Sequence, residues 1–222
     1  MHTYIDSTFM QTYVNAANII ICTLPTTGCF CSTDYCAPFR FHVQPLVTLG
    51  TDGREVWGVI QLYDEIYVVC DESPSILIYK AQEPFSRLDD VVVKEMKQPL
   101  DIAACWIARC LYVYDRKQKC IWTVKICSGG EMLVDKFIER IGVLTLSVSR
   151  DGDVSVVGGR KDIATHGIFV YSLDGEITTA IDLKGYGLEL PSRAVQTSTG
   201  SWLVANGANY AAVYCIYELT TD

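Results

Sequence analysis

The residues best suited to bind a metal ion are cysteines near the N-terminus. Cys29, Cys31 and Cys36 follow Cys22 within one short stretch, and thiolates are common zinc ligands. Structural zinc sites usually present their ligands as two pairs, each with two to four intervening residues. No second pair follows here, so the spacing favours an irregular segment over a zinc site.

The histidines and the known catalytic motifs point to no enzyme class. Two of the three histidines, His2 and His42, lie in this N-terminal part, and His166 lies in the polar stretch 160–167, which we interpret as a loop between two strands. A single histidine in a loop is usually a surface residue rather than a catalytic base. The sequence contains no G-x-S-x-G, H-E-x-x-H or G-x-x-x-x-G-K-[ST] motif.

Cys105 and Cys110 flank the short turn 106–109, so we expect them to face each other across a β-hairpin. A disulfide between them is one alternative. The other is a pair of reduced thiols that act as small buried apolar side chains, as we expect for most cysteines in the strands.

The composition indicates a folded protein with an acidic balance. Half of the 222 residues are hydrophobic, 20% are charged, and the net charge is −8. Nucleic acids and anionic membranes require concentrated Lys and Arg, so both are disfavoured as main partners. No apolar run approaches the roughly 18 residues of a membrane span, and the N-terminus lacks a basic signal-peptide region, which favours an intracellular, for example cytoplasmic, location.

Two short apolar strands recur together along the chain with a period of about 45 residues. The first pattern centres on Tyr67, Tyr112, Ser155 and Leu203, and the second begins at Ile76, Ile121, Ile168 and Tyr214. Outer strands are predicted over 88–95, 132–138 and 177–183, and pairs such as Asp151-Gly152 and Asp174-Gly175 supply hairpin turns. This periodicity predicts an all-β protein, a β-propeller of about four four-stranded antiparallel blades, either closed or an incomplete, open arc.

The predicted organisation has two parts. Residues 1–44 do not fit the repeat and are expected to form an irregular extension, and residues 45–222 form the propeller. The predicted blades are 56–95, 101–138, 144–183 and 193–219, and 46–49 is a spare outer strand. The last unit lacks a fourth strand, so this spare strand could close the ring.

The repeat units resemble NHL-type repeats. The similarity lies in Pro99-x-x-Ile102, Leu111–Asp115, Cys120–Val124, Val170–Ile177 and the junction Leu49–Trp57, and covers about residues 46–219. NHL-type propellers usually have six blades, so the resemblance implies that the four units could be part of a larger propeller. It also implies protein binding, more rarely RNA binding. Related six-bladed propellers include lactonases and lyases.

In a propeller, the loops from strand two to strand three and from strand four to the next blade gather on one face. We expect this face to bind a protein or peptide without a cofactor, because Arg, Trp and Tyr dominate protein interfaces. The expected contact residues are Arg54, Trp57, Arg116, Lys117, Arg193, Asn209 and Tyr210, and the same loops carry Lys97 and Gln98.

The alternative is a metal-dependent enzyme of the lactonase or lyase type. The resemblance implies a divalent metal held at the channel mouth by Glu, Asp and Asn oxygens, for which Glu55, Asp101 and Asn206 are the candidates. Asp115 has a simpler expected role, since it can cap the turn that follows its strand.

Overall fold

The computed structural model describes residues 10–15, 18–23, 45–127, 131–149, 151–160, 163–186, 188, 191–197, 200–206 and 215–219. The chain divides into two compact units, Met1–Val56 and Trp57–Asp222. Among these residues the only helix is the short 3-10 turn η1 (Lys184–Tyr186). None of the described segments forms a helix with the length and hydrophobicity that crossing a bilayer requires.

The first unit contains an antiparallel sheet that the sequence analysis missed. Its strands are β1 (Met10–Asn15), β2 (Asn18–Thr23) and β3 (Pro45–Gly50), in the order β1-β2-β3. The expectation of an irregular segment over 1–44 was therefore wrong for β1 and β2. The apolar run Ile19–Cys22 belongs to the central strand of this sheet. The predicted strand 46–49 lies in β3, and it pairs with β2 rather than standing spare.

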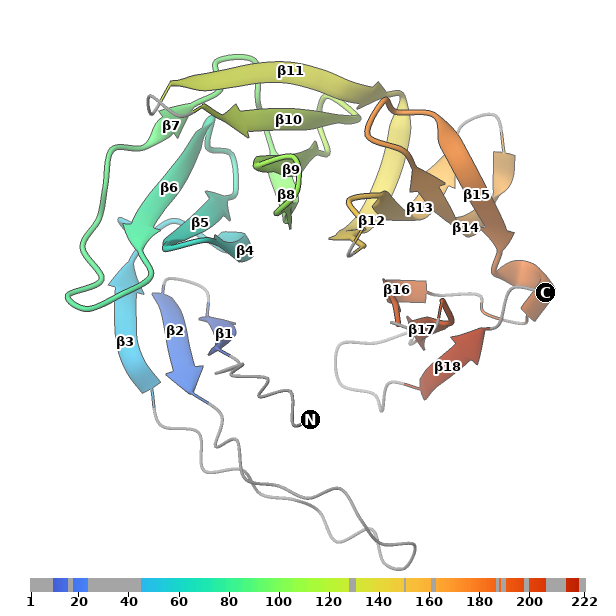
Figure 1. Cartoon of the computed structure of the whole chain (residues 1–222), viewed down its shortest axis with the longest axis horizontal. Coiled ribbons are helices and arrows are strands. Elements are labelled where there is room, and N and C mark those ends of the chain that lie inside the picture. The colour runs from blue at the N-terminus through green and yellow to red at the C-terminus, as the bar shows by residue number, and fades with distance from the viewer. Residues whose placement is uncertain are drawn as a thin grey trace, which may run out of the picture. The chain divides into compact units, whose positions relative to one another are not determined.

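The second unit contains the four predicted repeats, each as one antiparallel sheet with its strands in sequence order (Figure 1). Three sheets have four strands and the last has three in the described residues. The first comprises β4 (Val56–Leu62), β5 (Glu65–Cys70), β6 (Ser75–Lys80) and β7 (Val91–Val92). The second comprises β8 (Pro99–Cys105), β9 (Cys110–Asp115), β10 (Cys120–Ile126) and β11 (Met132–Glu139).

The third sheet comprises β12 (Ile141–Val148), β13 (Val154–Arg160), β14 (Ile163–Tyr171) and β15 (Ile177–Asp182). The fourth comprises β16 (Pro191–Gln196), β17 (Trp202–Asn206) and β18 (Cys215–Leu219). The described part of the chain thus holds five sheets in all, one more than the four predicted units, because of the sheet in the first unit.

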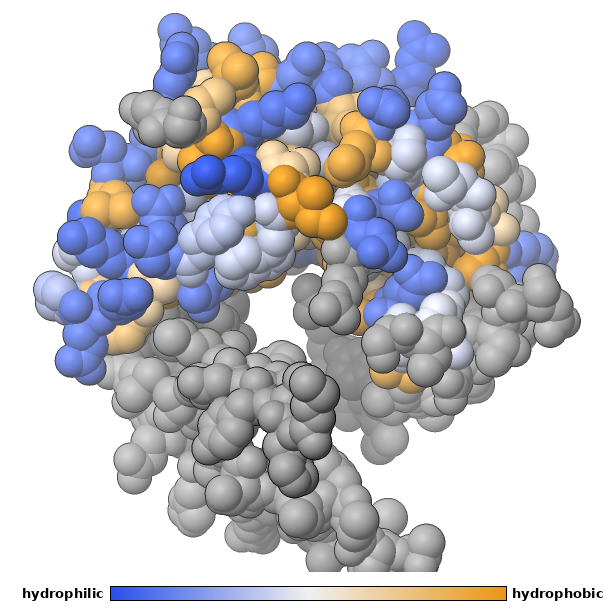
Figure 2. Space-filling model, viewed as in Figure 1, coloured by the Kyte–Doolittle hydropathy of each residue, from blue (hydrophilic) through white to orange (hydrophobic). Residues whose placement is uncertain are grey.

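The middle strands of the second and third sheets are apolar on both faces because each of these sheets packs between two others. In β9, Leu111 and Val113 point into a core shared with the first sheet, and Tyr112 and Tyr114 point into a core shared with the third. Successive residues of a strand face opposite sides, so one strand serves both cores. A further core joins the third and fourth sheets around Trp202. The outer strands β11 and β15 are mostly exposed, and Figure 2 shows hydrophobic residues between hydrophilic ones on the viewed surface.

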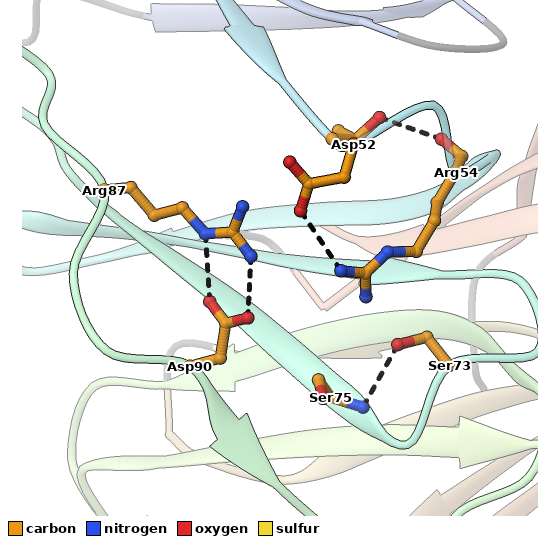
Figure 3. Close-up of polar contacts among 7 residues, drawn as sticks. Asp52, Arg54, Ser73, Ser75, Arg87 and Asp90 are labelled. Carbon is orange, nitrogen blue, oxygen red and sulfur yellow. Dashed lines mark hydrogen bonds and ion pairs between the residues drawn. The ribbon is translucent and has the colours of Figure 1, made fainter.

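The outer strand of the first sheet is much shorter than the predicted 88–95. Strand β7 contains only Val91 and Val92, which pair with β6, and Arg87 forms an isolated bridge to Tyr79 of β6. Arg87 binds Asp90 through two bonds, Nε to Oδ1 at 3.2 Å and Nη2 to Oδ2 at 2.7 Å (Figure 3). This contact spans the interruption between Arg87 and Val91 in the pairing with β6.

The predicted loop over 160–167 was also wrong. Strand β13 continues to Arg160 and β14 begins at Ile163, and His166 pairs with Gly159 inside the hairpin. The Asp-Gly turns were predicted correctly, since Gly152 and Gly175 have φ of 99° and 81°. Such positive values are typical of the glycine in a tight turn.

The expected pairing of Cys105 with Cys110 is confirmed. The two residues are direct partners where β8 ends and β9 begins, and both are free, buried thiols. Burial raises the pKa of the Cys110 thiol to about 11. Two reduced cysteines therefore pack here as apolar side chains.

Candidate functional site

Five exposed cationic side chains gather on two neighbouring loops of the second unit. One loop is the hairpin 116–119 between β9 and β10, and the other is the connection 93–98 that leads into β8. We call them the basic rim: Lys94, Lys97, Arg116, Lys117 and Lys119.

The Asp115 carboxylate holds the two loops of the basic rim together. It lies at the end of β9, is fully buried and accepts four backbone N–H groups. Oδ1 accepts those of Lys117 and Gln118, both at 3.0 Å, which caps the hairpin as predicted. Oδ1 also accepts the N–H of Gln98 at 3.2 Å, and Oδ2 that of Lys97 at 2.6 Å. The carboxylate therefore fixes both loops at once, because charge-assisted bonds to backbone amides are strong.

Further hydrogen bonds extend this connection. The Arg116 N–H donates to the Gln98 carbonyl at 2.9 Å, and the Gln118 side-chain amide donates to the Glu95 carbonyl at 3.3 Å. The Gln98 side-chain amide donates to Asp71 on the β5–β6 loop at 3.2 Å. The backbone beneath the basic rim is thus held by contacts from three loops.

The side chains of the basic rim are left to solvent. None of the five forms an ion pair with another residue that the structure describes. They form a local positive region on a chain whose net charge is −8. Such a region attracts carboxylates and phosphates and accelerates the encounter with an acidic partner.

The structure brings together two of the residues predicted to bind a partner, Arg116 and Lys117, with Lys97 beside them. Trp57 lies within β4, not in a loop, and the residue is 42% exposed. Arg54, in the first unit, forms a 3.2 Å ion pair with Asp52 across a turn in which Asp52 and Gly53 have positive φ (Figure 3).

The side chains of the other three predicted contact residues lie outside the part of the chain that the structure describes. Arg193 belongs to β16 and pairs with Ala205, but its side chain lies outside the described part, as do Asn209 and Tyr210 altogether. They remain predictions.

The three predicted metal ligands, Glu55, Asp101 and Asn206, stay a prediction, and the structure describes each of them separately. Asp101 is buried, and its two carboxylate oxygens accept the N–H groups of Ile102 at 2.9 Å and Leu146 at 2.7 Å. Glu55 is an exposed residue of the first unit, and Asn206 belongs to β17, with its side chain outside the described part. Among the residues described, no three His, Cys, Asp or Glu side chains lie close enough to hold a metal ion.

Two residues of the basic rim, Lys94 and Lys119, were not among the contact residues predicted from the sequence. The run Arg116-Lys117-Gln118-Lys119 was a usable signal, since three of its four residues are cationic. Lys94 lies more than 20 residues before the 116–119 hairpin in sequence, and the hydrogen bonds between the two loops show that they are neighbours.

No protein-family model and no curated protein sequence matches the chain. The NHL resemblance therefore stays a prediction.

Solved structures do match. A crystal structure of a nidogen/laminin complex has a TM-score of 0.63 at 13% identity, over 89% of this chain and 70% of that one. A putative 6-phosphogluconolactonase from Bacteroides uniformis has a TM-score of 0.62 at 11% identity, over 94% of this chain and 63% of that one. A functionally unknown protein from Desulfotomaculum acetoxidans has a TM-score of 0.56 at 12% identity, over 94% of this chain and 68% of that one.

The chain spans between 63% and 70% of the length of these three structures. At such low identity the likeness concerns the fold alone. Together with the repeated antiparallel sheets, it shows that this chain has a β-propeller fold.

Proposed function

We propose that this chain is a non-catalytic binding module that holds an acidic segment of a partner protein or peptide on the basic rim. One observation carries the proposal: a buried carboxylate, Asp115, fixes two loops that present five exposed cations. A rigid backbone beneath flexible cationic side chains reduces the entropy lost on binding.

The charge of the whole chain favours an acidic protein segment over RNA. A nucleic acid presents a long, uniform row of phosphates and binds through many Lys and Arg contacts. The basic rim is a small positive region on a chain of net charge −8, so a long polyanion would also meet the repulsion of the remaining surface. A short acidic segment avoids that repulsion.

The structural neighbours are compatible with this role. One of them is part of a complex of two proteins, nidogen and laminin. It supports the proposal only in that a propeller of similar fold takes part in a protein complex.

The test uses random peptides displayed on phage, selected on the full chain. Peptides enriched on the wild type are expected to carry Asp or Glu, and their affinity should fall by about tenfold or more in the K97E/R116E/K117E variant. The matched control is K80E/K125E/K184E, which reverses three exposed lysines outside the basic rim. A wild-type selection that enriches no acidic peptide, or an acidic peptide that binds equally to both variants, would contradict the proposal.

The alternative is a lactonase- or lyase-type enzyme, which the likeness to a putative 6-phosphogluconolactonase suggests. A metal content near one equivalent, lost in Asp101→Asn, together with hydrolysis of a lactone substrate, would favour it. Asp101→Asn is preferable to alanine because the amide oxygen still accepts one of the two backbone bonds.

A further inference from the structure

A second exposed surface lies at the other end of the strands. Strand β9 runs from Cys110 to Asp115, so the hairpin 106–109 before it and the hairpin 116–119 after it are at opposite ends. On the 106–109 side four large apolar or aromatic side chains reach solvent, which we call the hairpin patch: Tyr63, 39% exposed, Trp106, 53%, Ile107, 62%, and Leu173, 45%.

The aromatic half of the hairpin patch is a defined structure. The rings of Tyr63 and Trp106 pack edge to face with centroids 4.9 Å apart, and the Tyr63 hydroxyl donates to the Trp106 carbonyl at 2.7 Å. The Arg109 guanidinium lies over the Tyr63 ring, 5.3 Å from its centroid. These contacts join the β4–β5 hairpin to the β8–β9 hairpin while leaving much of the Trp106 surface exposed.

The aliphatic half continues onto the third sheet through Gly152. A Cβ atom at Gly152 would lie 3.6 Å from Leu173 Cδ2 and 3.9 Å from Ile107 Cδ1. Ile107 and Leu173 are therefore neighbours across the hairpins of two sheets. The hairpin patch is continuous over three sheets, which distinguishes it from isolated exposed apolar residues.

Acidic residues lie close to the hairpin patch in sequence. They occur on the hairpins of Tyr63, Gly152 and Leu173, and not on that of Trp106. Asp64 follows Tyr63, Asp151 and Asp153 flank Gly152, and Asp174 follows Leu173. None of these four carboxylates forms an ion pair with a described residue. Two described cations lie near the hairpin patch: Arg109 over Tyr63, and the exposed Lys125, the strand partner of Cys110. Arg150 lies outside the described residues.

We propose that the hairpin patch binds a segment of a partner protein in which large apolar side chains are flanked by Lys or Arg. The apolar side chains would cover Ile107 and Leu173, and the cations would meet the carboxylates of Asp64, Asp151 and Asp174 or the face of Trp106. An acidic segment would face uncompensated carboxylates. A second copy of this chain, docked by two-fold symmetry, would bring the same carboxylates together.

The experiment selects random phage-displayed peptides on the K97E/R116E/K117E variant, in which the basic rim has lost its net positive charge and should not bind acidic peptides. Enriched peptides are expected to combine Lys or Arg with Leu, Ile, Phe or Trp. Affinity for one synthetic enriched peptide should fall by about tenfold in I107S/L173S, because two apolar contacts are lost. In D64N/D151N/D174N the affinity should fall and depend less steeply on salt.

The control is R109G, which removes a cation from the cluster. Arg109 has φ of 50°, a conformation that glycine adopts readily, so the hairpin is expected to fold. This variant should bind the peptide as well as or better than the parent. Enrichment of acidic peptides, unchanged affinity in I107S/L173S, or dimerisation of the full chain that I107S/L173S abolishes would overturn the proposal.

Discussion

Removing the Asp115 carboxylate should destabilise the second unit more than any surface substitution. Four backbone N–H groups lose their acceptor in Asp115→Ala. A hydrogen bond to a charged group contributes about 1.5–3 kcal/mol, and an unsatisfied buried donor costs about 1–3 kcal/mol. Some of these N–H groups lie in loops and can reach water, so we expect a loss of about 3–5 kcal/mol in the free energy of unfolding rather than the full sum.

Asp115→Asn removes the negative charge of the side chain and keeps its shape. Its carbonyl oxygen can still accept the three N–H groups that Oδ1 accepts, from Gln98, Lys117 and Gln118. Its NH2 group would face the Lys97 N–H, donor against donor, where Oδ2 now accepts at 2.6 Å. We expect a loss of about 2 kcal/mol.

Urea unfolding followed by tryptophan fluorescence measures both losses. The control is Asp135→Ala, because the Asp135 carboxylate is exposed and accepts the N–H of the adjacent Lys136, a bond that links no second loop. That variant should stay within about 0.5 kcal/mol of the wild type. An Asp115→Ala variant within about 1 kcal/mol of the wild type would refute the idea that this carboxylate holds the two loops together.

Two further predictions concern the interior. Because burial raises the pKa of Cys110 to about 11, its thiolate fraction at pH 8 is about a hundredfold below that of a free cysteine. The stability that the buried, protonated Cys110 thiol contributes is fully present below the pKa of an unfolded cysteine and is lost as the pH rises toward 11. Peptide-resolved mass spectrometry should find iodoacetamide labelling of native Cys110 much slower than that of the half-buried Cys127, and equal rates would contradict this. Gly158→Ala should lower the free energy of unfolding by about 2–3 kcal/mol, because the added Cβ would lie 2.1 Å from the Gly142 carbonyl oxygen. The control is Gly50→Ala, whose Cβ would meet nothing within 4 Å. Equal melting temperatures of the two variants would contradict the prediction.

The sequence was sufficient to predict the repeated sheets, because a period near 45 residues is set by strand length and turn chemistry. Strands β9 and β10 lie where the apolar runs placed them. Strands β1 and β2 were missed because residues 1–44 do not fit the repeat. Strand β7 was predicted too long, because the pairing with β6 is interrupted between Arg87 and Val91.

The candidate site was predictable only in part. Arg116 and Lys117 could be assigned to a loop face from topology alone. Their connection to the 93–98 segment depends on Asp115, whose partners are 17 and 18 residues away in sequence. The hairpin patch was not foreseen, because Tyr63 and Trp106 are 43 residues apart and only the packing of adjacent sheets brings them together.

The Asp101 carboxylate has a consequence for how the second unit comes apart. It belongs to β8 yet accepts the backbone N–H of Leu146 in β12, so one buried residue joins the first strands of two consecutive sheets. Repeat proteins often unfold piecewise, because each module interacts only with its neighbours. If either sheet opens locally, the Leu146 N–H or the Asp101 carboxylate in the other sheet loses its partner. The amide hydrogens of these two sheets should therefore exchange as one cooperative block.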